Sequence, residues 1–386
     1  MRIADIETIV VDLPRRASYG WRSLKDPIGR YVILRLTTED GVVGLGEAPA
    51  ILSWGGEHGR YFGEDPHIVR YLVGEVIAPL LRGADPREMK PLLAELDVRV
   101  RGYPYTKSMI ECALLDILAR SAGVPLHRLL GGAARTEIPI CHSVGLAAPE
   151  DAARESEAAA ADGIGWLQVK VAGDVRRDVE VVGAVRRAVG DEVRIYPDVN
   201  RGYRETKAAI GAVRAMRDEA GIVAVEQPVE GLAAMRRVVE EIDLPVIVDE
   251  GCWSPQDAIE VVKAGAADLL SIYYTKAAGL GRAMEIGAIA RAAGLPSNVN
   301  GSLEAGVGNA ANLHLAAALE GATWPAVITI NTLAGREQTR VGGVFYLDDV
   351  ITEPFAYRDG RLAVPDGPGL GVELDPDKIA KYRVDS

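Results

Sequence analysis

The sequence has few cysteines and no N-terminal targeting pattern. Its three cysteines, Cys112, Cys141 and Cys252, are odd in number and lack the close spacing of a disulfide scaffold or a zinc site. This argues against a disulfide-stabilised secreted domain and favours a cytoplasmic protein with buried thiols. The N-terminus alternates apolar and polar residues and includes acids, so we expect no signal peptide.

Three further absences narrow the possible partners and folds. No cluster of lysine and arginine occurs and the net charge is −12, so neither nucleic acid nor an anionic membrane is an expected partner. No run of roughly 18 apolar residues is present, which argues against a transmembrane helix. No Gly-rich phosphate loop follows an early strand, as it usually does in a doubly wound sheet. The composition, 48% hydrophobic and 25% charged, is that of a globular protein with a sizeable core.

Two patterns divide the chain. Residues 1–125 contain three strand-like runs followed by helical patterns, which predicts an α+β domain. Over residues 126–340 short apolar strands alternate with helices in eight units, which predicts an α/β fold of the (β/α)8 type; an open doubly wound sheet is the alternative. The first and eighth of these strands are predicted at Ile138–Cys141 and Val327–Ile330. The Gly- and Pro-rich segment 341–386 is expected to return to the first domain.

Polar residues follow the apolar runs of the predicted barrel at regular intervals. Directly after five successive runs come Lys170, Asp198, Glu226, Asp249 and Tyr273. Neighbouring members of this series are separated by about one βα unit. Because the active site of a (β/α)8 barrel lies at the carboxyl ends of its strands, these side chains are expected to line one ring.

Three carboxylates on adjacent strand ends would repel one another in a partly desolvated site. A divalent cation bound by Asp198, Glu226 and Asp249 would remove this repulsion. Oxygen ligands without Cys or His favour Mg²⁺, or Mn²⁺, over Zn²⁺. Solvated or lysine-paired acids are the alternative for any single carboxylate, and a glycosidase pair fits less well because the acids occupy consecutive units. The sequence therefore predicts a magnesium site.

Lys170 precedes the first of these acids by one unit. A nearby cation disfavours the ammonium form, so the pKa of Lys170 is expected to fall from about 10.4 toward neutrality, as suits a general base. The metal can also bind a substrate carboxylate and stabilise the enediolate formed when the α-proton leaves. The combination points to proton abstraction next to a carboxylate. A structural counterion to the acids is the alternative role for Lys170.

These motifs resemble those of the enolase superfamily, within its mandelate racemase/muconate lactonizing enzyme subgroup. The shared order is Lys170, Asp-x-Asn at 198–200, Glu-Gln-Pro at 226–228 and Asp-Glu at 249–250, and the resemblance covers nearly the whole chain. It implies a modified TIM barrel with an N-terminal α+β capping domain, Mg²⁺ on the three acids and Lys170 as base. It also implies a homo-oligomer.

The resemblance further implies that two capping loops, around Tyr19–Trp21 and Leu52–His58, close over a small-molecule carboxylate. The subgroup's Lys-x-Lys on the second barrel strand is here Gln168-Val169-Lys170, so the contact of the first lysine with the substrate carboxylate is changed. Other candidates for substrate contacts follow the barrel strands. The full expected set is Gln168, Asn200, Lys276, Asn298, Asn300, Glu304, Tyr19, Trp21, Trp54 and His142.

Tyr273 stands where the subgroup has a lysine at the end of the sixth strand, facing the opposite side of the substrate. A phenol with a pKa near about 10 is a weak base at neutral pH. The sequence therefore favours one-base chemistry with Lys170, either β-elimination by a dehydratase or cycloisomerisation. A racemase or epimerase with Tyr273 as second acid/base is the alternative, as is a Tyr273 that only shapes the pocket. A non-catalytic carboxylate-binding protein is a third hypothesis.

Overall fold

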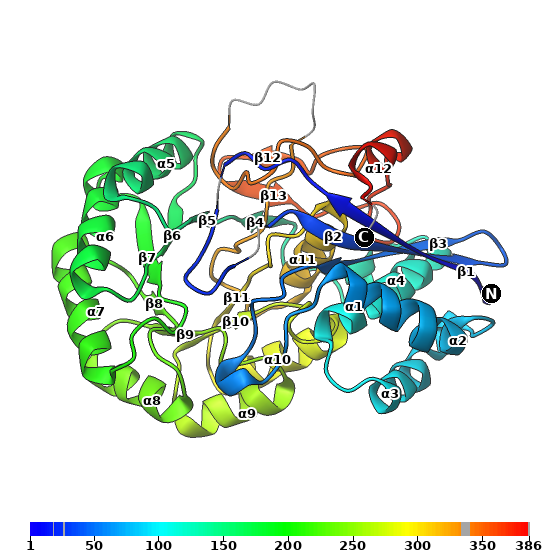
Figure 1. Cartoon of the computed structure of the whole chain (residues 1–386), viewed down its shortest axis with the longest axis horizontal. Helices are drawn as coiled ribbons and strands as arrows, with labels where there is room; N and C mark the ends of the chain where they lie inside the picture. The colour runs from blue at the N-terminus through cyan, green and yellow to red at the C-terminus, as the bar shows by residue number, and fades with distance from the viewer. Residues whose placement is uncertain (18, 26–27, 333–339, 385–386) are drawn as a thin grey trace.

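The computed structural model describes residues 1–17, 19–25, 28–332 and 340–384. In its N-terminal part an antiparallel sheet of strand order β1–β2–β3 packs against helices (Figure 1). The strands are β1 (Ile3–Asp12), β2 (Arg30–Thr38) and β3 (Val43–Pro49), and the α-helices are α1 (Pro66–Tyr71), α2 (Ala78–Leu81), α3 (Met89–Arg99) and α4 (Pro104–Ala122). The prediction of an α+β capping domain is confirmed.

Strand β3 approaches helix α4 very closely, and glycine makes this possible. A Cβ added at Gly46 would lie 2.1 Å from the carbonyl oxygen of Met109, and one at Gly44 would lie 2.2 Å from that of Ala113. Backbone atoms of a buried helix cannot yield as a flexible side chain can. The two glycines therefore set the distance between sheet and helix in the capping domain.

The replacement Gly46→Ala is expected to destabilise the protein by about 1–3 kcal/mol or more, because it overpacks this contact. Thermal unfolding measures the effect. Gly74→Ala is the matched control, since an added Cβ there would meet nothing within 4 Å and Gly74 lies in the helical segment Leu72–Ile77. Equal melting temperatures for the two variants would contradict the close approach of β3 to α4.

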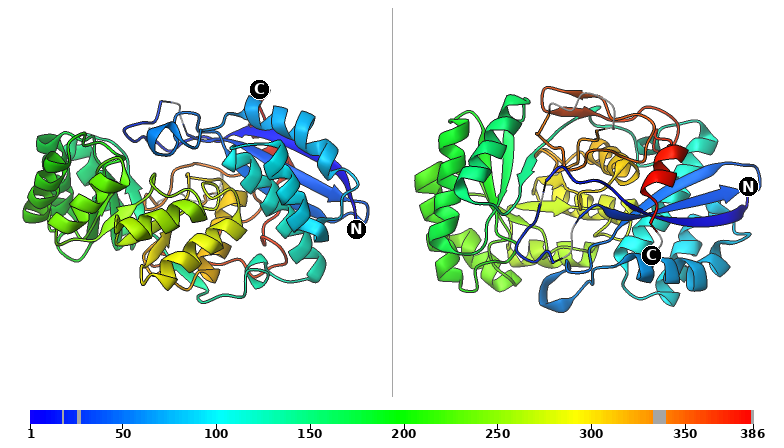
Figure 2. Two further views of the ribbon diagram at one scale, coloured as in Figure 1. Left: turned by 90° about the horizontal axis from the view of Figure 1, so that it is seen from below. Right: turned by 45° about the horizontal axis from the view of Figure 1, so that its top comes forward.

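The following part of the chain is a curled parallel sheet with helices outside it (Figures 1 and 2). In the described residues this sheet has the order β11–β10–β9–β8–β7–β6–β5. Its strands are β5 (His142–Val144), β6 (Trp166–Lys170), β7 (Arg194–Asp198), β8 (Val225–Glu226), β9 (Val246–Val248), β10 (Leu269–Ile272) and β11 (Ser297–Val299). The intervening helices are α5 (Pro149–Ala161), α6 (Val175–Val189), α7 (Thr206–Ala220), α8 (Leu232–Glu241), α9 (Pro255–Ala264), α10 (Leu280–Ala292) and α11 (Gly306–Ala318). The predicted modified TIM barrel is confirmed.

Local signals set the ends of these helices. The side chain of Asp174 accepts a hydrogen bond from the backbone of Arg177 at the start of α6, and Ser254 caps α9 in the same way. Helices α7 and α9 end at Gly221 and Gly265, both in the left-handed conformation that glycine adopts without steric cost. These two helices thus stop before the chain enters the next strand. No helix of the described residues is long and apolar enough to cross a membrane.

The predicted first and eighth barrel strands are wrong in detail. The run Ile138–Cys141 contributes instead to β4 (Glu137–Pro139), which joins β12 (Tyr357–Arg358) and β13 (Arg361–Ala363) in a separate sheet, while the barrel strand begins at His142. The run Val327–Ile330 makes one isolated bridge, between Val327 and Asn300, instead of a ladder in the described structure.

The backbone hydrogen bonds of these two segments explain the errors. Ile140 N donates to Gly360 O at 2.8 Å and Ile330 N donates to Gly343 O at 2.7 Å, so both segments pair with the C-terminal part of the chain. Val327 N donates to the side-chain Oδ1 of Asn300 at 3.0 Å and Val327 O accepts from Gly301 N at 3.0 Å, so the run meets the end of β11 at one bridge. Neither Gly360 nor Gly343 belongs to a neighbouring βα unit, so the apolar runs carry no signal of these bonds.

The last segment lies beside the first sheet. Helix α12 (Pro376–Tyr382) contacts β1, and Val384 N donates to Val10 O at 2.9 Å. Figure 1 shows α12 next to the capping domain. We propose on these contacts that the end of the segment, from α12 to Val384, returns to the capping domain, while β12 and β13 pair with β4 beside the barrel; the division at 125 and 340 stays a prediction.

Candidate active site

The carboxyl ends of neighbouring barrel strands bring the predicted lysine and acids together. Sheet register pairs Lys170 of β6 with Asp198 of β7, and Asp198 with Glu226 of β8. Asp249 follows β9 directly. All four side chains are buried. These residues therefore lie side by side at one end of the barrel.

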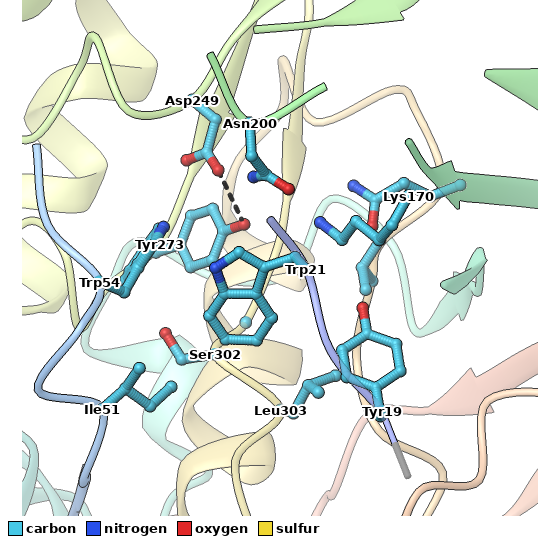
Figure 3. Close-up of a pocket in the computed structure, with 13 residues that line it drawn as sticks. Tyr19, Trp21, Ile51, Trp54, Lys170, Asn200, Asp249, Tyr273, Ser302 and Leu303 are labelled. Carbon is cyan, nitrogen blue, oxygen red and sulfur yellow. Dashed lines mark hydrogen bonds between the residues drawn. The ribbon is translucent and has the colours of Figure 1, made fainter. Parts of the chain in front are cut away.

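A cavity opens where these strand ends face the capping loops (Figure 3). The loop after β1 contributes Tyr19 and Trp21, and the loop after β3 contributes Ile51 and Trp54. In the view of Figure 3, Lys170 and Tyr273 lie on opposite sides of the cavity. The barrel residues in its wall are Gln168, Lys170, Asn200, Asp249, Tyr273, Gly301, Ser302, Leu303 and Val327.

Each of the three candidate ligands is held by a different donor. Lys170 Nζ forms an ion pair with Asp198 Oδ2. Glu226 Oε2 accepts a hydrogen bond from Gln168 Nε2 at 2.7 Å.

Asp249 has two donors. Its Oδ1 accepts from Lys276 Nζ at 2.7 Å, and its Oδ2 accepts from the hydroxyl of Tyr273 at 3.4 Å. Lys276 Nζ also donates to the carbonyl oxygens of Asp249 and Ser271. Lys276 therefore holds Asp249 in place.

Burial and mutual repulsion shift the ionisation of the cluster. Burial raises the pKa of Asp198 and of Glu226, and the neighbouring carboxylates raise both further. Burial alone would lower the pKa of Lys170, but attraction by Asp198, Tyr19 and Glu226 together outweighs burial and raises it above the ordinary value. The lowered pKa expected from the sequence depends on the charge of a bound cation; with carboxylates as neighbours the shift has the opposite sign. Burial, followed by the charge of Asp249, also raises the pKa of Tyr273.

The donor types of this cluster fit a hard divalent cation. Three carboxylates converge from adjacent strands, and the Oε1 atom of Glu226 is buried without a hydrogen-bond partner in the described structure. Among the described residues, however, no three acidic, histidine or cysteine side chains surround one point as metal ligands do. The reason is visible in the hydrogen bonds: Lys170, Gln168 and Lys276 each occupy an oxygen of one carboxylate. A bound ion would compete with Lys170 for Asp198, whereas Glu226 can offer its unpartnered Oε1 while Gln168 keeps Oε2.

Six predicted substrate contacts or catalytic side chains reach the cavity wall besides Lys170. Asn200 sits in a left-handed conformation, φ 45°, and its amide donates to Asp198 and Glu250. Glu250, which accepts from Asn200 through Oε1, is buried, and its Oε2 atom has no described hydrogen-bond partner. The six are Tyr19, Trp21, Trp54, Gln168, Asn200 and Tyr273.

The structure does not place His142, Asn300 or Lys276 in the cavity wall. The ring of His142 bridges Glu155 and Gly343 N. The amide of Asn300 is used at both ends, since it donates to Ser271 and accepts from Val327 N. Partners within the protein thus occupy the polar atoms that were predicted to contact substrate.

Asn298 and Glu304 also lie behind the wall. Glu304 is fully buried, accepts from Ser302 N at 2.9 Å and from Asn312 Nδ2 at 3.1 Å, and so supports the loop that carries Ser302. The side-chain amide of Asn298 is buried without a described partner. Neither side chain lines the cavity directly.

Sequence reasoning missed the wall residues Ile51, Gly301, Leu303 and Val327, while it did note the hydroxyl of Ser302 as a hydrogen-bonding group. Leu303 adopts a left-handed conformation, φ 57°, and its carbonyl accepts from the hydroxyl of Tyr346 at 2.8 Å. The hydroxyl of Ser302 is buried without a described partner. Ile51 and Val327 are apolar, so a search for polar residues after strands passes over them. The Gly-Ser-Leu-Glu sequence at 301–304 was the available signal for this loop.

Comparison with known protein families identifies the chain. Residues 9–131 match the mandelate racemase / muconate lactonizing enzyme N-terminal domain, and residues 151–378 match the enolase C-terminal domain-like family. The chain belongs to the enolase superfamily. Within that superfamily it falls in the mandelate racemase/muconate lactonizing enzyme subgroup, as its motifs predicted.

Relatives of this enolase-superfamily chain carry out several isomerase reactions. Muconate cycloisomerase 1-1 of Acinetobacter lwoffii is 31% identical over 386 residues, covering 99% of this chain and 97% of the relative. The L-Ala-D/L-Glu epimerase of Bacillus subtilis (strain 168) is 30% identical over 379 residues, covering 96% and 97%. The crystal structure of N-succinyl Arg/Lys racemase from Bacillus cereus ATCC 14579 superposes with a TM-score of 0.89 at 26% identity, covering 100% of this chain and 99% of that one. The prediction of an enzyme of this superfamily is confirmed.

Proposed function

We propose that this enolase-superfamily enzyme removes the α-proton of a small carboxylate substrate with Lys170 as its single base and with Mg²⁺ or Mn²⁺ as cofactor. The observation that carries the proposal is the composition of the cavity wall. Among its described residues Lys170 alone bears a basic group, and a phenol, Tyr273, faces it. One-base β-elimination and cycloisomerisation are the reactions that such a wall supports best. The muconate cycloisomerases among the relatives favour the second of these.

Each part of the site has a role in this proposal. Asp198, Glu226 and Asp249 would hold the metal, which when bound supplies positive charge beside the carboxylate that becomes an enediolate. Lys170 Nζ takes the α-proton as a neutral amine, the form that the positive charge of the cation would favour. Trp21 and Trp54 cover the reacting centre and exclude water, which strengthens electrostatic interactions inside the site.

A second candidate is racemisation or epimerisation with Tyr273 as the acid on the other face. The position of Tyr273 opposite Lys170 favours it, as do the epimerase and racemase among the relatives. A carboxylate-binding protein without catalysis is the third hypothesis. A cytoplasmic location and a homo-oligomer stay predictions.

Exchange of the substrate α-proton with D₂O separates these functions. We expect Mg²⁺-dependent exchange, measured by NMR across acid sugars, lactones, hydroxyprolines and aryl succinates, and its loss with EDTA. In Tyr273→Phe we expect a one-base reaction to keep at least about a tenth of the wild-type rate, whereas epimerisation would fall by about 10²–10⁴, the contribution of an acid or base. Tyr71→Phe, at an exposed tyrosine, is the matched control. Exchange that survives EDTA would contradict the metal, and binding of a carboxylate without exchange would favour the third hypothesis.

A further inference from the structure

A chain of three hydrogen bonds connects a capping loop to one of the candidate metal ligands. The Tyr19 hydroxyl lies 2.6 Å from Ser143 Oγ, which donates to Gln168 Oε1 at 2.6 Å. Gln168 Nε2 in turn donates to Glu226 Oε2 at 2.7 Å. Ser143 and Gln168 are buried, at 0% and 2% exposure, so water does not compete for these bonds.

The chemistry of the groups sets the direction of this chain. Glu226 is ionised when it acts as a metal ligand and then only accepts hydrogen bonds, so it requires the NH₂ end of the Gln168 amide. The carbonyl end of Gln168 then requires the Ser143 proton, and Ser143 Oγ is left to accept the proton of Tyr19. Every member has one orientation that satisfies both neighbours. The orientation of Tyr19 on the loop is thereby tied to the orientation of Glu226 in the barrel.

The second capping loop reaches the site through another buried amide. Gln227 Nε2 donates to Glu57 Oε1 at 2.9 Å, and Gln227 Oε1 accepts from the backbone N of Asp249 at 2.8 Å. Glu57 lies in the loop after β3 and is itself buried. Gln227 holds a left-handed backbone, φ 37°, which a residue other than glycine adopts at a cost. Both loops are thus bonded to amides that contact candidate ligands.

We propose that Tyr19, Ser143 and Gln168 are positioning residues that orient Glu226 for the metal when the first capping loop is closed, so that loop closure and metal binding reinforce each other. The proposal rests on the proposed function, because it takes Glu226 as a ligand. Hydrogen-bonded partners behind metal ligands commonly change metal affinity by about 10–100-fold when they are removed. Coupling between two binding events is reciprocal. If the site binds the metal more tightly when the loop is closed, the bound metal must favour the closed loop by the same factor.

The first test is titration of the purified full chain with Mn²⁺, with free Mn²⁺ measured by electron paramagnetic resonance. Tyr19→Phe keeps the ring, which packs edge-on against Phe345 at 5.0 Å, and removes only the hydroxyl. We expect its Kd for Mn²⁺ to rise about tenfold, and Ser143→Ala to have the same effect. The double variant should be no worse than either single one, because each breaks the same chain. Tyr71→Phe should bind as the wild type does.

The second test is hydrogen exchange of residues 19–25 and 50–63 with and without Mn²⁺. We expect about tenfold slower exchange with the metal in the wild type, and loss of this protection at residues 19–25 in Tyr19→Phe. Wild-type affinity in both single variants, or additive losses in the double variant, would overturn the inference. Failure of the wild type itself to bind Mn²⁺ would instead overturn the metal in the proposed function, so the two failures are distinguishable.

Discussion

Lys170→Ala is expected to lower the rate of α-proton exchange by about 10³-fold or more while leaving Mn²⁺ affinity equal to or tighter than that of the wild type. A positioned general base contributes about 10²–10⁴ to the rate, and among the described wall residues no other basic side chain can replace Lys170. The affinity for Mn²⁺ should not fall, because the Lys170 ammonium competes with a cation for Asp198. Exchange by NMR and Mn²⁺ titration measure the two quantities separately.

Two controls make this result decisive. Lys263→Ala removes an exposed lysine paired with Glu260 on the surface and should change neither quantity. Lys170→Met keeps most of the side-chain length and should show the same loss of exchange as Lys170→Ala. Removal of Lys170 leaves Asp198 buried without its counterion, so both variants should lose stability without metal and regain it with Mn²⁺. Unchanged exchange in a folded, metal-binding variant would remove Lys170 from its role as base.

The strand-end residues could be placed from sequence because the βα repeat is local. Each apolar run is followed by its own polar residue, so Lys170, Asp198, Glu226 and Asp249 are found without any long-range information. The residues that complete the wall depend on the capping loops and on the loop at 301–304, and Ile51 and Leu303 carry no polar group to reveal them. Their position follows from tertiary packing alone.

Hydrogen-bond partners explain the remaining differences between the predicted substrate contacts and the observed cavity wall. His142 looked available for substrate because nothing near it in sequence shows that Glu155 and Gly343 take both ring nitrogens. The same holds for Asn300, whose amide closes the barrel at Val327 where an eighth strand was predicted. In each case a polar residue after a strand serves the scaffold. The pattern of polar residues after strands therefore predicts where a site lies better than which of its polar groups remain free.

Glu226→Gln is expected to weaken Mn²⁺ binding by at least about 100-fold and, without metal, to raise the melting temperature. The amide keeps an oxygen for Gln168 Nε2 and adds NH protons near two carboxylates, where Glu226 has a buried oxygen without a described partner. It also removes the burial penalty of a carboxylate, a gain of about 1–3 kcal/mol. Calorimetry without metal and Mn²⁺ titration measure the two effects, with the exposed Glu240→Gln as control.

The stabilisation by Glu226→Gln should grow with pH. Burial, followed by repulsion from Asp198 and Asp249, raises the pKa of Glu226 in the folded protein well above its ordinary value. The folded state therefore keeps a proton that the unfolded state releases, and stability falls as pH rises from the ordinary glutamate pKa, about 4.3, to the raised one. Below this window both states are protonated and the variant gains little; above it the gain is complete. A gain that shrinks as pH rises, or a variant less stable than wild type without metal, would show that the carboxylate is stabilised in the folded protein without a cation.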